Sequence, residues 1–265
     1  MDKVIDMTKI ALFDFDNTLY SHKTYTIPES TKKALKELKE KGIIIVLATG
    51  RCEFEMETYF DIEEYGFDYR VLQNGQIIIG KDKNIIYSAP ITGIDKENAL
   101  KIFQNKTIPM ILATIDDYYL NYANDQVRTT VESVSSPVPE IKEYDGKDFY
   151  MMSIFPGEAE HFDEFIKINF PNCYATIWTV GSYDILYKGC DKGNGLKRLA
   201  DLLDIDIKDT IAFGDADNDI AMIESAGIGV ALGNSCNNLK KVADYVTDDI
   251  DEDGLYNALK HFNII

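Results

Sequence analysis

Apolar runs and amphipathic stretches alternate through the first part of the chain. Residues 10–13 form an apolar run that ends in a cluster of aspartates, and residues 43–47 form a second run, rich in β-branched side chains. Such runs are typical of strands buried on both faces of a sheet. Between them, residues 28–30 predict a helix start and Gly42 a helix end, with three apolar side chains on one face: Ala34, Leu35 and Leu38. This order predicts a parallel βαβ unit.

The same pattern returns near the carboxyl end. Asp191 can cap a helix whose apolar stripe is formed by Leu196, Leu199, Leu202 and Leu203. Further short runs predict strands at residues 210–213, 228–232 and 245–246, and helices at 220–224 and 254–262.

The middle of the chain has a different texture, rich in tyrosine and phenylalanine and holding most of the prolines. It predicts strands at residues 108–115, 149–155 and 173–179, and helices at 95–104 and 158–168. The sequence therefore predicts a doubly wound parallel α/β core from residues 1–80 and 188–265, with an α+β insertion at 81–187. Gly80 and Gly189 mark the expected hinges.

Composition narrows the class of protein. Forty-five acidic residues against 27 Lys+Arg give a formal charge of −18, which opposes binding to nucleic acid or anionic membranes. The longest apolar stretch, residues 43–48, is too short to cross a bilayer, and residues 1–9 have no secretory signal pattern. We expect a cytoplasmic protein. The cysteines are far apart, which disfavours zinc and disulfide frameworks: Cys52, Cys173, Cys190 and Cys236.

Two aspartates, Asp14 and Asp16, lie at the end of the first predicted strand. Open α/β sheets bind ligands at the carboxyl ends of their strands. There, Asp14 can attack phosphorus as a nucleophile, while Asp16 protonates the leaving alcohol and later deprotonates the attacking water. An acidic turn after a strand has the same letters, so this segment alone leaves both interpretations open. His22 follows shortly and could border such a cleft, with a structural role as the alternative.

Groups suited to a phosphate follow two other predicted elements. Thr49 and Gly50 come after the second strand, where a hydroxyl and backbone N–H groups can hold phosphoryl oxygens. Lys192 begins a predicted helix and supplies a positive charge. For Arg51, a substrate contact and a salt bridge at a helix end are equally open.

A metal site is also indicated. Asp215 follows the strand predicted at residues 210–213. Together with Asp14 and the Asp16 carbonyl it provides oxygen ligands of the kind that Mg²⁺ prefers. The ion would neutralise charge and let the carboxylate and the phosphate approach each other.

Four segments follow one another along the chain in this order: DFDNTL at 14–19, ATGR at 48–51, DKGNGL at 191–196 and GDADND at 214–219. They resemble the four motifs of the haloacid dehalogenase superfamily. The segments GIGVALGNS and ADYVTDD, and QNG at 73–75, resemble its Cof-like branch, and the insertion resembles that branch's type-IIB cap. Asn17 departs from the branch, which more often has glycine there, but asparagine also tolerates positive φ.

The resemblance implies a role for each matching residue. Asp14 would be the nucleophile and Asp16 the general acid/base, with phosphate contacts from Thr49, Gly50, Lys192 and Asn218. Mg²⁺ would be bound by Asp14, Asp16 and Asp215, with Asp219 in a supporting role. The implied protein is a Mg²⁺-dependent phosphatase that acts on small phosphomonoesters, sugar phosphates first, through an aspartyl-phosphate on Asp14. A phosphomutase on the same scaffold and a non-catalytic phosphometabolite-sensing module remain alternatives.

Overall fold

The computed structural model of this chain describes residues 8–134, 136–157 and 161–265. Contacts between residues divide it into two compact units. The first unit comprises Met1–Gly50, Ile62–Ile86 and Asp191–Ile265, and the second comprises Arg51–Asp61 and Tyr87–Cys190. Within the described ranges, no helix has the length and apolar character needed to cross a membrane.

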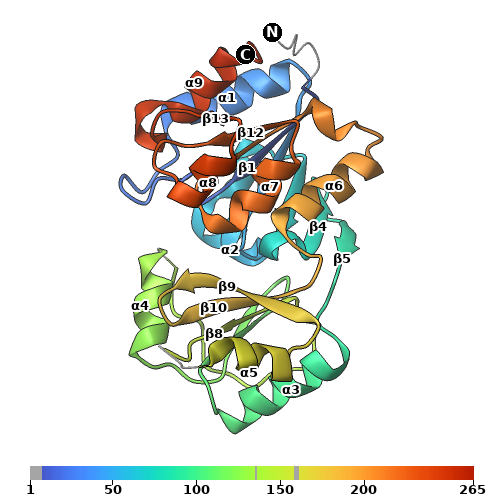
Figure 1. The fold of residues 1–265 in the computed structure, drawn as a ribbon, viewed down its shortest axis with the longest axis vertical. Helices are drawn as coiled ribbons and strands as arrows, with labels where there is room; N and C mark the ends of the chain where they lie inside the picture. Colours follow the sequence, from blue (N-terminus) through green and yellow to red (C-terminus); the bar gives the residue numbers. More distant parts are fainter. Residues whose placement is uncertain (1–7, 135, 158–160) are drawn as a thin grey trace. The chain divides into compact units, whose positions relative to one another are not determined.

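An 8-stranded sheet, in the order β13-β12-β11-β1-β2-β3-β4-β5, forms the centre of the first unit (Figure 1). Strands from β13 to β3 pair in parallel, and β4 runs antiparallel to β3. The parallel α/β architecture is therefore confirmed. The strands are β1 (Ile10–Asp14), β2 (Ile44–Ala48), β3 (Tyr69–Leu72), β4 (Ile77–Gly80), β5 (Ile85–Ser88), β11 (Thr210–Gly214), β12 (Ile228–Ala231) and β13 (Tyr245–Val246).

Helices cover both faces of this sheet. The connection from β1 to β2 through α1 and the connection from β11 to β12 through α7 step in opposite directions across the sheet. Since such crossovers are right-handed, α1 and α7 lie on opposite faces. Helix α9 packs against α1, while α6 and α8 pack against α7. The helices are α1 (Glu29–Glu40), α6 (Lys192–Leu202), α7 (Ile220–Ser225), α8 (Asn237–Val242) and α9 (Gly254–His261).

The predicted helix boundaries of this unit agree with local structure. Helix α1 follows Pro28, and Gly42, with φ of 74°, lies just after its end. Helix α6 begins after Asp191, whose side chain accepts a hydrogen bond of 2.7 Å from the Asn194 N–H. The end of α1, at Gly42, and the start of α6, at Asp191, therefore use the capping chemistry predicted from the sequence.

The β3–β4 hairpin was not predicted. Its connection is a short 3₁₀ turn in which Gln73 and Asn74 have positive φ values of 49° and 54°. Non-glycine residues adopt this backbone only where surrounding contacts hold them, so local propensity gives little sign of the turn. Other 3₁₀ turns are η1 (Ile62–Tyr65), η3 (Ile207–Asp209), η4 (Asp217–Asp219) and η5 (Ile250–Glu252); the hairpin turn is η2 (Gln73–Gly75).

A 5-stranded antiparallel sheet, in the order β7-β6-β8-β10-β9, forms the second unit. Strand β9 has the predicted bounds, β6 and β8 are shorter than predicted, and β7, β10, α2 and α4 were not predicted. The first part of the helix predicted from residue 158 lies outside the described residues. The elements are α2 (Glu53–Phe60), α3 (Gly93–Asn105), β6 (Met110–Ala113), β7 (Tyr118–Leu120), α4 (Asp125–Ser133), β8 (Met151–Ile154), α5 (Phe162–Asn169), β9 (Cys173–Thr179) and β10 (Ser182–Tyr187).

Helices pack on both faces of this second sheet. Side chains alternate along β6, so Met110 and Leu112 point to one face and Ile111 to the other. The first pair shares an apolar cluster with α3 and α5, and Ile111 packs with α4. The insertion thus has a core of its own.

The segment Arg51–Asp61 was predicted to belong with the α/β core, but by its contacts it is grouped with the second unit. The Tyr118 hydroxyl on β7 donates a 2.7 Å hydrogen bond to Glu55, and the ring packs edge-on against Phe54. The chain therefore passes between the units at four points, two of them directly after Gly50 and directly before Asp191.

One carboxyl group of the second unit, that of Asp184, has a pKa shifted mainly by burial. Asp184 lies on β10, and its carboxylate accepts a 2.6 Å hydrogen bond from the Ser153 hydroxyl on β8. Burial raises the pKa of Asp184 to about 6, and the bond from Ser153 offsets only part of that effect.

This pKa predicts how stability depends on pH. The folded protein holds the Asp184 proton up to about pH 6, while the unfolded chain releases it near the ordinary value of 3.8. The contribution of Asp184 is therefore most favourable below about pH 4 and is lost as the pH rises through 6. Asp184→Asn should stabilise the protein at neutral pH by about 1–3 kcal/mol and leave it unchanged at low pH. Urea unfolding of both proteins across this range measures the difference, and equal pH profiles would contradict the assignment.

Candidate active site

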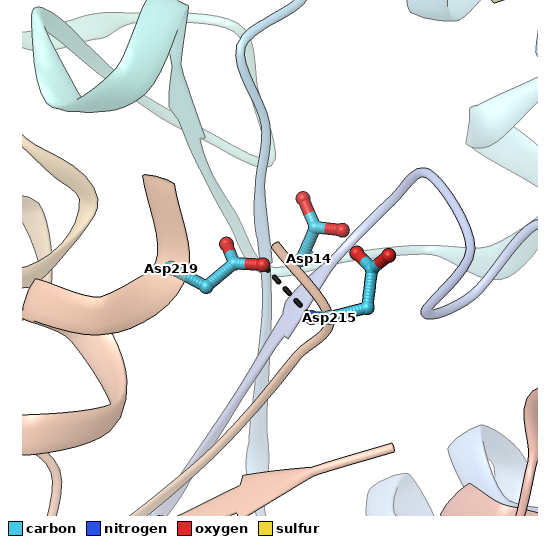
Figure 2. A group of neighbouring side chains, drawn as sticks. All are labelled: Asp14, Asp215 and Asp219. Atoms are coloured by element: carbon cyan, nitrogen blue, oxygen red, sulfur yellow. Dashed lines mark hydrogen bonds between the residues drawn. The ribbon is translucent and has the colours of Figure 1, made fainter. Parts of the chain in front are cut away.

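The carboxyl ends of β1 and β11 bring the first and fourth motifs together. Asp14 is the last residue of β1, and its side chain is buried. Phe13 pairs with Phe213, so Asp215, just after β11, lies beside Asp14. One carboxylate oxygen from each of Asp14, Asp215 and Asp219 lies within 4.8 Å of the others (Figure 2).

Asp219 is held by a tight turn after β11. Its Oδ2 accepts hydrogen bonds from the backbone N–H groups of Asp215, at 2.9 Å, and Ala216, at 3.1 Å. A Cβ at Gly214 would lie 2.6 Å from the Asp219 Cβ, so only glycine allows this approach. The turn therefore holds the Asp219 carboxylate against the backbone of Asp215.

Lys192 joins the third motif to this cluster. Its Nζ donates hydrogen bonds to Asp14 Oδ1 at 2.5 Å and to Asp219 Oδ1 at 2.7 Å, and its side chain has no exposed surface. Gly193 allows the close packing of α6 on α7 that brings the lysine here, because a Cβ would lie 2.2 Å from the Ala221 carbonyl oxygen.

The pKa values in the cluster follow from burial and charge. Burial raises the pKa of Asp14 to about 7, and the charge of Asp219 adds to this while Lys192 opposes it. Burial, followed by the charges of Asp14 and Asp219, holds the pKa of Asp215 well above its usual range. For Lys192, burial opposes the charged form, but the two carboxylates outweigh it and raise its pKa.

The donor set fits a divalent cation. The carboxylates of Asp14, Asp215 and Asp219 face one compensating lysine, and both oxygens of Asp219 already accept hydrogen bonds. Asp14 and Asp215 are therefore the side chains best placed for direct contact with an ion, with Asp219 behind them. Hard oxygen donors of this kind suit Mg²⁺.

Two of the phosphate-binding candidates, Thr49 and Gly50, lie directly after β2. Thr49 is buried, its N–H donates to Val71, and its carbonyl accepts from the Asn74 N–H at 3.0 Å. The Asn218 side chain donates a 3.1 Å hydrogen bond to Asn74 Oδ1, and the Asn74 side chain lies against Gly50. Asn74 was not among the predicted site residues, although it belongs to the QNG segment.

The loop after β1 places two further residues. Thr18 is buried and donates to Asp215 at 3.5 Å. Asp16 lies beside His22, whose Nε2 is 2.6 Å from Asp16 Oδ1. The positive φ expected at Asn17 is present, at 55°.

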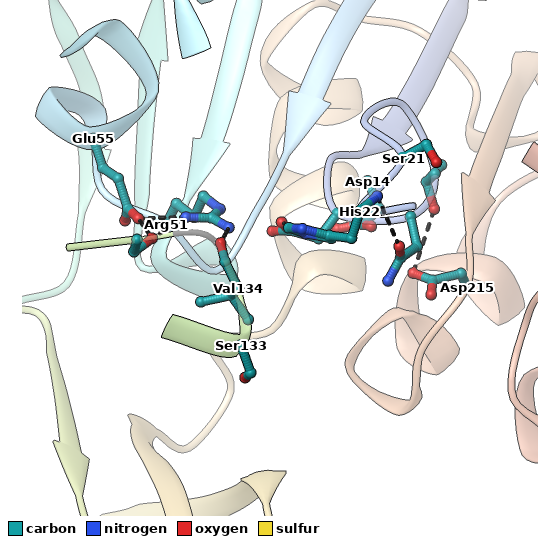
Figure 3. Close-up of polar contacts among 12 residues, drawn as sticks. Asp14, Ser21, His22, Arg51, Glu55, Ser133, Val134 and Asp215 are labelled. Carbon is teal, nitrogen blue, oxygen red and sulfur yellow. Dashed lines mark hydrogen bonds and ion pairs between the residues drawn. The ribbon is translucent and has the colours of Figure 1, made fainter. Parts of the chain in front are cut away.

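Arg51 is held within the second unit. It forms an ion pair with Glu55 and donates to the Ser136 hydroxyl at 2.6 Å and the Val134 carbonyl at 2.7 Å (Figure 3). Its guanidinium group also stacks over the Phe60 ring, 4.6 Å from the centroid. Of the predicted site residues, Arg51 alone belongs to the second unit, and its contacts there include the salt bridge that was one of the two interpretations.

Comparisons with known proteins agree with the motifs. A family model for haloacid dehalogenase-like hydrolases matches residues 11–259. The putative phosphatase YkrA of Bacillus subtilis is 33% identical over 261 residues, 97% of this chain and 99% of YkrA. The superfamily phosphatase BT1666 of Bacteroides thetaiotaomicron is 30% identical, with a TM-score of 0.87 over 98% of this chain and 96% of its own. The subclass IIB sugar phosphatase BT4131 is 29% identical, with a TM-score of 0.85 over 97% of this chain and 100% of its own.

Removing the lysine charge tests the cluster. Lys192→Met should lower the free energy of unfolding in metal-free buffer by about 3–5 kcal/mol, because it leaves two buried carboxylates without their cation. Adding Asp14→Asn should recover part of the loss, since one of those charges is then gone. Calorimetry on the two single variants and the double variant measures the coupling. Additive losses would mean that Lys192 and Asp14 do not interact.

Proposed function

The chain belongs to the haloacid dehalogenase-like hydrolases and is a phosphatase, and we propose that it hydrolyses small phosphomonoesters through an aspartyl-phosphate on Asp14. The observation that carries this proposal is the contact of Asp14 with both Lys192 and the carboxylate cluster. A buried carboxylate beside a lysine and a group of carboxylates that could hold a metal ion is suited to react with a phosphate group.

The reaction proceeds in two displacements. Asp14 attacks phosphorus, the bond from phosphorus to the alcohol oxygen breaks, and Asp16 gives its proton to the departing alcohol. Asp16 then takes a proton from water, which attacks phosphorus and releases inorganic phosphate and the Asp14 carboxylate. Dividing one displacement into two lowers the barrier, and the positioned acid/base contributes on the order of 10²–10⁴ in rate.

Charge is the main obstacle to the first step, because an anionic nucleophile must approach an anionic substrate. Mg²⁺ bound by Asp14, Asp215 and the Asp16 carbonyl would neutralise part of that charge. Lys192 supplies a fixed positive charge at the same place. Thr49, Gly50 and Asn218 would hold phosphoryl oxygens, and Asn74 orients Asn218 through its hydrogen bond.

The substrate class is proposed from similarity. BT4131 is a sugar phosphatase, and the likeness extends over nearly the whole of both chains. We therefore place sugar phosphates and related metabolites first. The second unit, as the cap, would supply substrate specificity.

Substitution of the nucleophile is the direct test. Asp14→Asn should lower turnover by more than about 10³-fold on every phosphomonoester in a panel, because the acyl phosphate on Asp14 can then no longer form. Asp201→Asn, on the exposed surface of α6, is the matched control and should keep wild-type rates. Near-normal rates in Asp14→Asn would exclude this nucleophile. Hexose bisphosphate-dependent isomerisation of hexose phosphates, assayed alongside, would indicate a mutase instead.

Metal dependence gives a second test with a readout besides activity. EDTA should stop hydrolysis, and Mg²⁺ should restore it and raise the melting temperature of the metal-free protein. Asp215→Asn should weaken Mg²⁺ binding at least about tenfold in calorimetric titration. Asp16→Asn should bind Mg²⁺ nearly as wild type does, because its contribution is a backbone carbonyl. Full activity in chelator would contradict the metal assignment.

A further inference from the structure

We propose that His22 is a positioning residue for Asp16, and that its imidazole holds the Asp16 carboxyl in the orientation used for proton transfer. This inference rests on the acid/base role in the proposed function. The contact that motivates it is short: His22 Nε2 lies 2.6 Å from Asp16 Oδ1. Neither side chain is strongly exposed, at 17% for His22 and 30% for Asp16.

The loop that carries His22 is tightly built. Leu19 and Tyr20 N–H groups both donate to the Phe15 carbonyl, at 2.9 and 2.8 Å, and Ser21 N–H donates to Thr26 at 3.0 Å. The Ser21 hydroxyl accepts from two further backbone N–H groups of the turn. The backbone on both sides of His22 is therefore held by hydrogen bonds rather than left to vary.

Aromatic contacts orient the imidazole ring. The Tyr20 ring meets it edge-on, with the centroids 5.3 Å apart, and itself stacks on Phe15 at 5.4 Å. Phe15 is fully buried, and in the sequence it stands between Asp14 and Asp16. The histidine is thus connected through two rings to the segment that carries both catalytic aspartates.

This arrangement addresses a particular weakness of the site. A carboxyl on a partly exposed loop can rotate, and a proton donor misplaced by about 1 Å can cost on the order of 10²-fold in rate. A hydrogen bond with a ring that is itself fixed by packing reduces that freedom. His22 touches no reacting atom in this scheme, and the proton given to the alcohol comes from Asp16.

The dependence of rate on the leaving group tests the proposal. The value of kcat/KM includes only steps through departure of the alcohol. An alkyl phosphate needs its leaving oxygen protonated, whereas p-nitrophenyl phosphate does not, because p-nitrophenolate leaves as an anion. Loss of Asp16 positioning should therefore lower kcat/KM for the alkyl ester alone.

Three variants separate the hydrogen bond from ring packing. His22→Phe keeps a ring and His22→Asn keeps polarity, but neither places a hydrogen-bonding nitrogen at the Nε2 position. Both should lose on the order of tenfold in kcat/KM for an alkyl phosphate and little for p-nitrophenyl phosphate. His22→Gln carries its amide nitrogen as many bonds from Cα as Nε2 and should recover most of the loss. His261→Gln, remote on α9, is the control substitution.

The outcomes are distinct. Equal losses on both esters, or none, would overturn the positioning role, as would a Gln variant as impaired as the Phe variant. Melting temperatures identify any variant that fails to fold. If His22→Phe or His22→Asn does so, the other of these two is compared with His22→Gln. Failure of the proposed function itself would give different results. Asp14→Asn would keep its activity, or Asp16→Asn would not lose more kcat/KM on the alkyl ester than on p-nitrophenyl phosphate.

Discussion

The buried ammonium of Lys192, held between Asp14 and Asp219, is the interaction on which the site depends. A lysine with no exposed surface is stable only where anions compensate its charge. It therefore requires β1, α6 and the turn after β11 to meet at one point. Asp219 ties that point to the backbone through the N–H groups of Asp215 and Ala216. The same contacts that stabilise the lysine thus place the proposed nucleophile and the carboxylate proposed to bind a metal ion.

Charge explains why this centre needs more than its lysine. The chain has a net charge of −18, and the carboxylates around Asp14 exceed the single cation among them. Burial is the main cause of the raised pKa values of Asp14 and Asp215, and the neighbouring carboxylates raise them further. Arg51, the cation of the second motif, is paired with Glu55 in the second unit. Under the proposed function, a divalent ion bound by Asp14 and Asp215 would offset part of the charge between Asp14 and a phosphate dianion.

Prediction from sequence succeeded where chemistry is local. The ends of β1, β2 and β11 follow from apolar runs closed by polar residues, and the start of α6 follows from Asp191. These signals place four residues near the carboxyl ends of the central strands: Asp14, Thr49, Asp215 and Lys192. The β3–β4 hairpin was missed because its turn relies on positive φ at two non-glycine residues. Its consequence for the site, the bond from Asn218 to Asn74, joins residues far apart in the chain and has no local pattern.

His22 and Arg51 show the other limit of sequence reasoning. His22 closely follows the first motif and Arg51 ends the second, and these positions along the chain could not show which side chains surround them. The contact of His22 with Asp16 depends on the path of a loop, which its internal hydrogen bonds determine. The partners of Arg51 at residues 134 and 136 lie in the insertion, far along the sequence. Side-chain direction at such positions is a property of the tertiary structure.

The chain leaves the first unit directly after Gly50 and returns directly before Asp191, so residues proposed to bind phosphate flank two of its connections. Each is nevertheless anchored within the first unit: Thr49 by Val71 and Asn74, and Lys192 by Asp14 and Asp219. Changes in the second unit need not disturb those contacts. Under the proposed function, substrate choice could then vary through the insertion while the reacting groups keep their geometry, which is how one fold serves many substrates.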